Sequence, residues 1–173
     1  IDAYDPENKL VFMTSVMTGA PVSGQGRHTA AGLSPLTGGL ADSQCGGWWG
    51  AELKFATYDG LIVEGKSSSP VYISIQDEQV QILSAVDLWG KTTGEVQVDL
   101  HEKYSHKSRV LQCGPAGEKR VRFANITADL RNFHGRGGLG AVMGSKNLRA
   151  IVVRGTHRKL KIYDPEGLSK IAT

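Results

Sequence analysis

The residues best suited to chemistry in this chain stand among glycines. Arg27 lies in the segment SGQGRHT, and Arg136 lies in GRGG. Glycines let a ligand touch main chain that a Cβ atom would block, and a guanidinium grips a phosphate or a planar heterocycle with two parallel contacts. A glycine-rich turn that leads into a helix also presents free N–H groups and a partial positive charge. These segments predict sites for anionic groups.

A weak internal repeat indicates that there are two such sites. The segments GGWWGAELKFATYDGLIVEGK, from Gly46, and GGLGAVMGSKNLRAIVVRGT, from Gly137, share a Gly-Gly start, a small-residue helix and a strand that ends in glycine. Each follows a polar segment that is typical of turns, GLADSQC and RNFHGR. Two equivalent units predict a duplicated, pseudo-twofold domain. Alone, such a loop is typical of plain turns, and GRGGLG lacks the spacing of a dinucleotide-binding loop.

The elements that must position these loops are of the α+β class. Helices are expected at Gly47–Tyr58, Thr93–Tyr104 and Leu139–Asn147. Apolar alternation and β-branched residues predict strands at Leu10–Met17, Gly60–Gly65, Pro70–Gln76, Val80–Leu83, Arg109–Cys113, Val121–Ile126 and Arg149–Arg154. Runs of strands with single helices between them favour an α+β domain of mixed or antiparallel sheets with a few short helices.

Bulk composition excludes several classes of protein. The chain has 173 residues and a formal charge of only +3, so it lacks the basicity of a nucleic-acid-binding protein. The dense cationic run Arg154–Lys161 is expected to be a solvated edge. No run approaches the ~20 apolar residues of a membrane span, and no signal peptide opens the chain. Two cysteines without a C-x-x-C pair indicate neither a disulfide framework nor a zinc site. A cytoplasmic location is therefore expected.

Several further side chains invite a role but have simpler interpretations. One of Trp48 and Trp49 is expected in the core, and the other against a neighbour. Cys45 is expected to be a small buried residue rather than a metal-site thiol. Glu118 is expected to be a turn residue rather than a general base. The histidines lack a partner pattern and are expected on the surface: His28, His101, His106 and His157.

Long motifs, in order, resemble one known family. The chain is similar to the amino-terminal domain of the tungsten-containing aldehyde ferredoxin oxidoreductases. The resemblance runs from about Pro6 to Thr156 and rests on SPLTGGLADSQCGGWWGAELKFATYDGLIVEGK, LWGKTT, GPAGEKRVRFA and GRGGLGAVMGSKNLRAIVVRG. It implies a duplicated base of two sheets that cradles tungsten or molybdenum in two pyranopterin molecules. It also implies a Mg2+ ion that bridges the two pterin phosphates.

The resemblance assigns roles to residues of the first copy. Arg27 matches an arginine that contacts a pterin. Gln44 takes the place of an asparagine whose main-chain carbonyl binds Mg2+, and Gly46 matches a glycine of the same turn. A main-chain ligand does not depend on its side chain, so glutamine at this position is compatible with the site.

The second copy receives the matching roles. Phe133 falls where an alanine offers the opposite Mg2+-binding carbonyl, and Gly135 and Arg136 match the Gly-Arg of the family. Asn132 replaces an arginine of many relatives, which weakens a phosphate or pterin contact unless a neighbouring cation, Arg131 or His134, reaches in. Phe133 and His134 are also bulkier than the usual alanines.

The resemblance further implies an activity and an incomplete chain. Members oxidise aldehydes to carboxylates with ferredoxin as acceptor, and distant relatives run low-potential reductions. Residues 1–156 are expected to be the tungsto- or molybdopterin-binding domain without its first strands, and residues 157–173 the start of a linker or helix toward downstream domains. The 4Fe–4S cluster and the acid–base residues are expected there, so this chain alone is expected to be inactive. A cofactor-free scaffold domain and a homodimer remain open.

Overall fold

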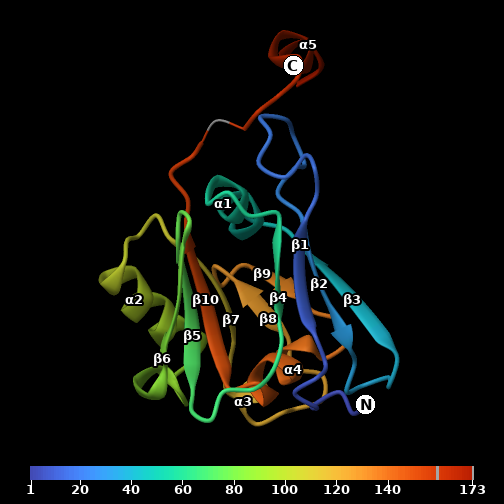
Figure 1. Cartoon of the computed structure of the whole chain (residues 1–173), viewed down its shortest axis with the longest axis vertical. Helices are drawn as coiled ribbons and strands as arrows, with labels where there is room; N and C mark the ends of the chain where they lie inside the picture. Colours follow the sequence, from blue (N-terminus) through green and yellow to red (C-terminus); the bar gives the residue numbers. More distant parts are fainter. Residues whose placement is uncertain (159, 173) are drawn as a thin grey trace.

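In the computed structural model, which describes residues 1–158 and 160–172, two β-sheets are joined by short helices (Figure 1). The first sheet has the strand order β3-β2-β1-β4, and every neighbouring pair is antiparallel. Its strands are β1 (Leu10–Thr14), β2 (His28–Leu33), β3 (Leu40–Cys45) and β4 (Gly60–Val63).

The second sheet has the strand order β6-β5-β10-β7-β8-β9. All its pairs are antiparallel except β5 with β10, which is parallel. Its strands are β5 (Val71–Gln76), β6 (Gln79–Ser84), β7 (Arg109–Cys113), β8 (Ile126–Ala128), β9 (Asn132–His134) and β10 (Leu148–Arg154). The polar residues DEQ between Gln76 and Val80 predict a turn that joins two strands in a hairpin, and this is confirmed, because β5 and β6 pair across a two-residue turn at Asp77 and Glu78.

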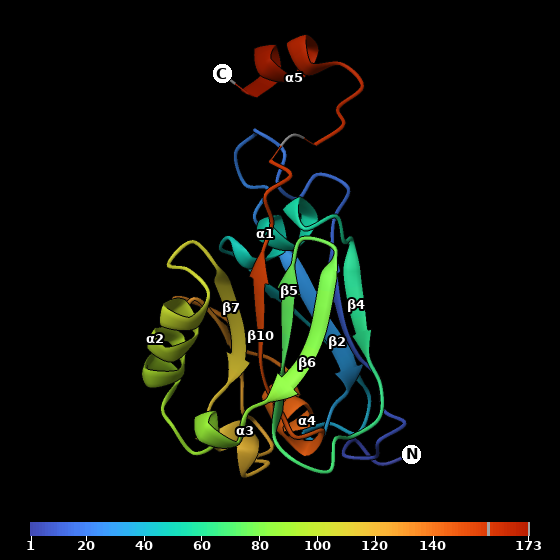
Figure 2. The ribbon, with the colours of Figure 1, turned by 60° about the vertical axis from the view of Figure 1, so that its left-hand side comes forward.

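The helices are short. They are α1 (Trp49–Phe55), η1 (Val86–Leu88), α2 (Thr93–Lys103), α3 (Pro115–Glu118), α4 (Leu139–Ser145) and α5 (Pro165–Ala172). Helix α2 begins with a capping box, in which Thr92 and Glu95 satisfy each other's main-chain N–H groups. Helix α5 stands apart from the two sheets and buries none of its residues (Figures 1 and 2). Within the described residues no helix is long and apolar enough to cross a bilayer.

Strand order reveals the duplication that the sequence predicts. In the first sheet β3 is followed by α1 and then β4, and the order is β3-β2-β1-β4. In the second sheet β9 is followed by α4 and then β10, and four of its strands have the order β9-β8-β7-β10. Each copy therefore consists of the same four antiparallel strands with a helix between the third and the fourth. The β5–β6 hairpin is an addition to the second copy.

The two copies are held together by their helices and one shared core. Helix α1 packs on β7 and β10 of the other copy, while α4 packs on β1 and β2. Trp49 is fully buried and donates its indole N–H to the carbonyl of Ile151, at 3.2 Å. Glu52, 1% exposed, binds Arg154 and Arg158. Arg154 is therefore partly buried, whereas Arg158 is 48% exposed and His157 is also exposed, as expected for a solvated edge. Lys159 of the same run lies outside the described residues.

The structure corrects several predicted elements. The polar segments GLADSQC and RNFHGR were expected to be turns, but they contain the edge strands β3 and β9. The strand predicted over Val121–Ile126 is wrong, because β8 begins only at Ile126 and Phe123 is 73% exposed. The main chain there covers α4, since a Cβ atom at Gly140 would lie 2.1 Å from the Asn125 carbonyl oxygen. The α+β class with two sheets and short helices is confirmed. The division at Thr156 stays a prediction.

Candidate functional site

The candidate site lies where the edge strands of the two copies meet. β3 is an edge strand of the first sheet, β9 is an edge strand of the second, and the two strands contact each other. The His134 ring donates through Nδ1 to the Ser43 carbonyl, at 2.6 Å. The Arg136 main-chain N–H donates to the Ser43 hydroxyl, at 3.2 Å. The polar segments that precede the two helices are therefore fixed side by side.

The glycines after β3 bring the two segments into direct contact. Gly47 has a φ of +88°, and a Cβ atom there would lie 2.6 Å from Nδ2 of Asn132. At Gly46 a Cβ atom would lie 3.3 Å from Oδ1 of the same side chain. Only glycine combines this φ with this close approach. The Asn132 amide therefore lies against the turn of the other copy.

Gln44 and Phe133 hold the same place in the two copies. Each is the second-last residue of its edge strand, and each pairs with the second residue of the adjacent strand, Thr29 for Gln44 and Thr127 for Phe133. Both side chains are exposed, Phe133 by 50%. The matched positions named from the sequence are thus equivalent in the fold and close together.

Two guanidinium groups lie beside these strand ends. Arg27 directly precedes β2, Arg136 follows β9 after Gly135, and both arginines are exposed. Among the described residues neither pairs with a carboxylate. A Cβ atom at Gly135 would meet no heavy atom within 4 Å, so the main chain there borders open space. The edge therefore presents free positive charge and accessible main chain to an anion.

One idea from the sequence is wrong. The N terminus of α4 was expected to face outward, yet every residue of α4 is buried. A Cβ atom at Gly138 would lie 1.9 Å from the Arg122 carbonyl oxygen, and the Gly140 N–H already donates to the Ala124 carbonyl. This helix end has no room for a phosphate, so strand ends rather than helix ends form the exposed edge.

His134 does not replace the positive charge that Asn132 lacks. Its ring is fully buried on the inner side of β9, and burial lowers its pKa to about 4, against the opposing hydrogen bond to Ser43. It is therefore neutral near pH 7. Arg131 is exposed, so of the two alternatives only this residue carries a charge at the surface.

Three potential metal ligands lie beneath the exposed edge. Ligand atoms of His28, Cys45 and His134 all lie within 4.8 Å of one another, and the three residues are buried. His28 and Cys45 are register partners across β2 and β3, while His134 comes from β9 of the other copy. Burial lowers the pKa of His28 to about 3, with His134 adding to the shift, and raises the pKa of the Cys45 thiol to about 12.

Sequence reasoning missed this cluster. The expectation that Cys45 is buried is confirmed, but His28 is 2% exposed rather than on the surface. The ring nitrogens Nδ1 and Nε2 of His28 and Nε2 of His134 are buried without hydrogen-bond partners, which costs about 1–3 kcal/mol for each unsatisfied group. The sequence offers one indication of this cluster. His28, Cys45 and His134 each directly follow a residue that the resemblance assigns to the cofactor site, namely Arg27, Gln44 and Phe133.

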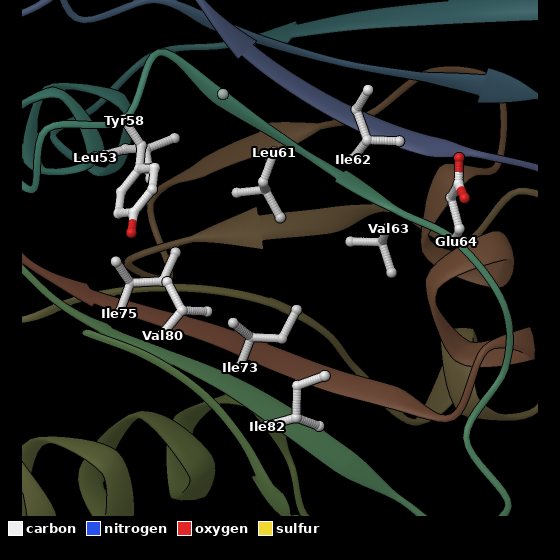
Figure 3. A pocket seen from close by; sticks show the side chains of 11 residues that line it. Leu53, Tyr58, Leu61, Ile62, Val63, Glu64, Ile73, Ile75, Val80 and Ile82 are labelled. Carbon is white, nitrogen blue, oxygen red and sulfur yellow. The ribbon is translucent and has the colours of Figure 1, made fainter. Parts of the chain in front are cut away.

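A second hollow is less suited to chemistry. Figure 3 shows a groove of about 310 Å³ between β4 and the β5–β6 hairpin, lined mainly by aliphatic side chains. Glu64 lies at one end, and the Tyr58 hydroxyl is already donated to the Glu78 carbonyl, at 3.0 Å. The groove offers almost no polar group that would orient a substrate.

The family described as "Aldehyde ferredoxin oxidoreductase, N-terminal domain" matches residues 1–155. The chain belongs to this family. It is 49% identical to the tungsten-containing aldehyde ferredoxin oxidoreductase of Pyrococcus horikoshii, over 95% of the chain and 27% of that relative. It is 36% identical to the aliphatic sulfonate oxidoreductase, WOR-like subunit, of Pyrococcus furiosus, over 96% of the chain and 28% of the relative.

A solved structure shares the fold. The active-site complex BamBC of benzoyl coenzyme A reductase, solved with 1,5-dienoyl-CoA, superposes with a TM-score of 0.96 at 38% identity, over 99% of this chain and 26% of that chain. This aldehyde ferredoxin oxidoreductase domain therefore spans about a quarter of the length of its curated relatives. Its relatives are oxidoreductases, and several are named for tungsten.

Proposed function

We propose that this chain holds the two phosphates of a tungsten or molybdenum bis-pyranopterin cofactor between β3 and β9. The observation that carries the proposal is the equivalence of Gln44 and Phe133, which occupy the same place in two copies whose edge strands are in contact. A duplicated domain suits a ligand with two similar halves. The tungsten in the names of the relatives supports this choice of metal.

The residues at this edge fit such a ligand. Arg27 and Arg136 are exposed and free of carboxylate partners among the described residues, so both are available to phosphates or to the planar pterin rings. The open space at Gly135 admits a ligand to the main chain. Main-chain carbonyls are oxygen ligands of the kind that Mg2+ takes together with phosphate oxygens. In this proposal the carbonyls of Gln44 and Phe133 hold the bridging Mg2+ ion.

In this proposal the cofactor and the protein have different roles. When bound, the metal and its dithiolene sulfurs supply the redox chemistry. The chain's own residues neutralise the phosphates and orient the pterins, with Asn132 and Gly46 closing the contact between the copies. A 4Fe–4S cluster needs four thiolates, whereas the chain has only Cys45 and Cys113, both buried. We therefore propose that the cluster lies outside this chain.

The reaction proposed for the whole protein is oxidation of aldehydes to carboxylates, with ferredoxin as the electron acceptor. Identity to the tungsten-containing aldehyde ferredoxin oxidoreductases, at 44–49%, is higher than to the sulfonate oxidoreductase, at 36%, or to the benzoyl-CoA reductase complex, at 38%. A low-potential reduction is the alternative within this family. Oxidation of an aldehyde with reduction of ferredoxin by the purified whole protein, which includes the cluster-bearing domains, supports the first reaction. Dependence of turnover on a reduced electron donor supports the second.

Cofactor content tests the binding proposal. Tungsten, molybdenum and pterin are measured in anaerobically purified protein and in the variants Arg27→Gln and Arg136→Gln. We expect about one metal atom and two pterins per chain in the parent protein and a loss in both variants. Lys107→Gln, which removes an exposed charge between α2 and β7, is the control and retains the cofactor. Absence of metal and pterin in repeated preparations would instead support a cofactor-free scaffold domain.

A further inference from the structure

The cluster of His28, Cys45 and His134 has the composition of a transition-metal site. Two imidazoles and one thiol supply ligand atoms that all lie within 4.8 Å of one another. In a bound site with Zn–N near 2.0 Å and Zn–S near 2.3 Å, ligand atoms are separated by about 3.3–3.8 Å. The three ligand atoms must therefore approach one another by about 1 Å to bind one ion.

The hydrogen bonds around His134 leave one nitrogen free for a ligand role. A carbonyl oxygen only accepts, so Nδ1 of His134 carries the proton that is donated to Ser43. Nε2 therefore holds the lone pair, and it is buried without a partner. A ring N–H fixed by a main-chain carbonyl is the arrangement in which proteins orient metal-binding histidines.

Neither ring nitrogen of His28 makes a well-formed hydrogen bond, although only 2% of the residue is exposed. The main chain of Gly26 lies close enough to favour the protonated ring slightly, but burial outweighs this effect and lowers the pKa to about 3. Its ring lies against the rings of Trp49 and His134, with centroids at 5.0 and 4.8 Å, and Phe12 covers His134 from another side. These aromatic neighbours pack against the imidazole, and its ring nitrogens have no nitrogen or oxygen hydrogen-bond partner. Core packing alone thus leaves three ring nitrogens without a hydrogen-bond partner, two on His28 and Nε2 of His134. A cation shared by the two histidines would bind one nitrogen of each ring.

We propose that His28, Cys45 and His134 bind one transition-metal ion, Zn2+ or Cu+, and that the Cys45 thiol loses its proton to solvent when the ion binds. Thiolate and imidazole ligands favour these ions over Mg2+ or Ca2+, which take oxygen ligands. Two ligands come from the first copy and one from the second, so the ion links the two halves of the domain.

The site is separate from the pterin edge. Along β3 and β9 exposed and buried side chains alternate, so Cys45 and His134 point inward where Gln44 and Phe133 are exposed. The ion stabilises the strand ends from beneath, whether or not tungsten is bound above them. Its content is therefore measured independently of tungsten and pterin, and the failure of either proposal leaves the other intact.

Metal analysis of untagged protein, purified without chelators, tests the site in the protein as isolated. We expect about one zinc or copper atom per chain in addition to tungsten or molybdenum. Metal-depleted protein is then titrated separately with Zn2+ and, anaerobically, with Cu+, and the tighter ion identifies the occupant. Saturation at one ion per chain supports the proposal even when the isolated protein is empty. Failure to bind either ion overturns it.

Variants assign the ligands. Cys45→Ser is expected to weaken binding at least ~100-fold, because it removes a direct ligand. Cys113→Ser changes the other buried cysteine, which lies outside the cluster, and keeps the parent affinity. Cobalt-loaded protein should show a thiolate-to-cobalt absorption band that Cys45→Ser loses and Cys113→Ser keeps. If Cys45→Ser does not fold, X-ray absorption of the loaded parent protein decides: one sulfur and two imidazoles support the site, and a metal without sulfur overturns it.

Discussion

Replacing Gly47 with alanine tests whether the two copies touch as described. Gly47 has a φ of +88°, and the new Cβ atom would lie 2.6 Å from Nδ2 and 3.2 Å from Cγ of Asn132. Gly24 supplies a matched control, because its φ is +81° and a Cβ atom there meets no heavy atom within 4 Å. The two substitutions thus share the backbone strain and differ in the contact with Asn132.

The magnitudes follow from these two terms. A non-glycine residue in the left-handed region costs about 1–2 kcal/mol, so Gly24→Ala should lower the free energy of unfolding by that amount. Gly47→Ala carries the same strain and also displaces the Asn132 side chain, which adds about 1–3 kcal/mol, as in other overpacked sites. The substitution Asn132→Ala, added to Gly47→Ala, shortens the side chain that the new Cβ atom would meet. It should therefore remove the destabilisation that comes from this contact and leave the backbone strain.

Urea unfolding of the parent protein, Gly47→Ala, Asn132→Ala and the double variant measures the contact with Asn132 in a double-mutant cycle, and Gly24→Ala measures the backbone strain alone. A coupling of about 1 kcal/mol or more between Gly47→Ala and Asn132→Ala is expected. In cofactor-loaded protein, Gly47→Ala should also lower tungsten content more than Gly24→Ala does, because Asn132 adjoins Phe133. Equal stability of the two glycine variants, together with no coupling to Asn132, would refute the described contact.

Two further predictions concern stability. Arg149 and Glu118 form an ion pair at 2.8 Å with side chains 0% and 5% exposed, so Glu118→Gln should lower the free energy of unfolding, measured in urea, by about 3–5 kcal/mol. Glu64→Gln, in the solvent-exposed pair with Lys9, should lower it far less. A loss below about 1 kcal/mol for Glu118→Gln would contradict the buried pair. Burial raises the pKa of the Cys113 thiol from 9.0 to about 12. The unfolded thiol therefore ionises first, and stability present below pH 9 is lost above it, by at most about 1.4 kcal/mol per pH unit. Unfolding at several pH values should show a smaller loss in Cys113→Ser than in the parent protein, because the buried Cys45 thiol, whose pKa is also raised to about 12, still contributes. Identical pH profiles of the two proteins would refute the role of Cys113.

The strand predictions succeeded for the hairpin and for β10, which are rich in apolar, β-branched residues, and missed strands that are rich in small and polar residues. The hairpin β5–β6 and the strand β10 have strong local patterns, and both were predicted. β2 and β3 are rich in small and polar residues, HTAAGL and LADSQC, so their local pattern resembles turns. They form strands because β1 and the contact with β9 provide partners.

The site was predictable in part, for a related reason. The repeat and the resemblance correctly indicated that the segments around Gln44 and Phe133 are equivalent, since both features are visible along the chain. The role of His28 was not predictable, because His28 and His134 are far apart in sequence and meet only after the two copies pack. Partner-free nitrogens become visible only when burial is known.

The central claim is that the two edge strands together hold one doubly phosphorylated ligand. An experimental structure of the cofactor-loaded protein tests it most directly. The account predicts two phosphate groups and a Mg2+ ion between the main-chain carbonyls of Gln44 and Phe133, with Arg27 and Arg136 beside the cofactor. Phosphates bound away from these strand ends, or a cofactor seated in the groove between β4 and the β5–β6 hairpin, would contradict it.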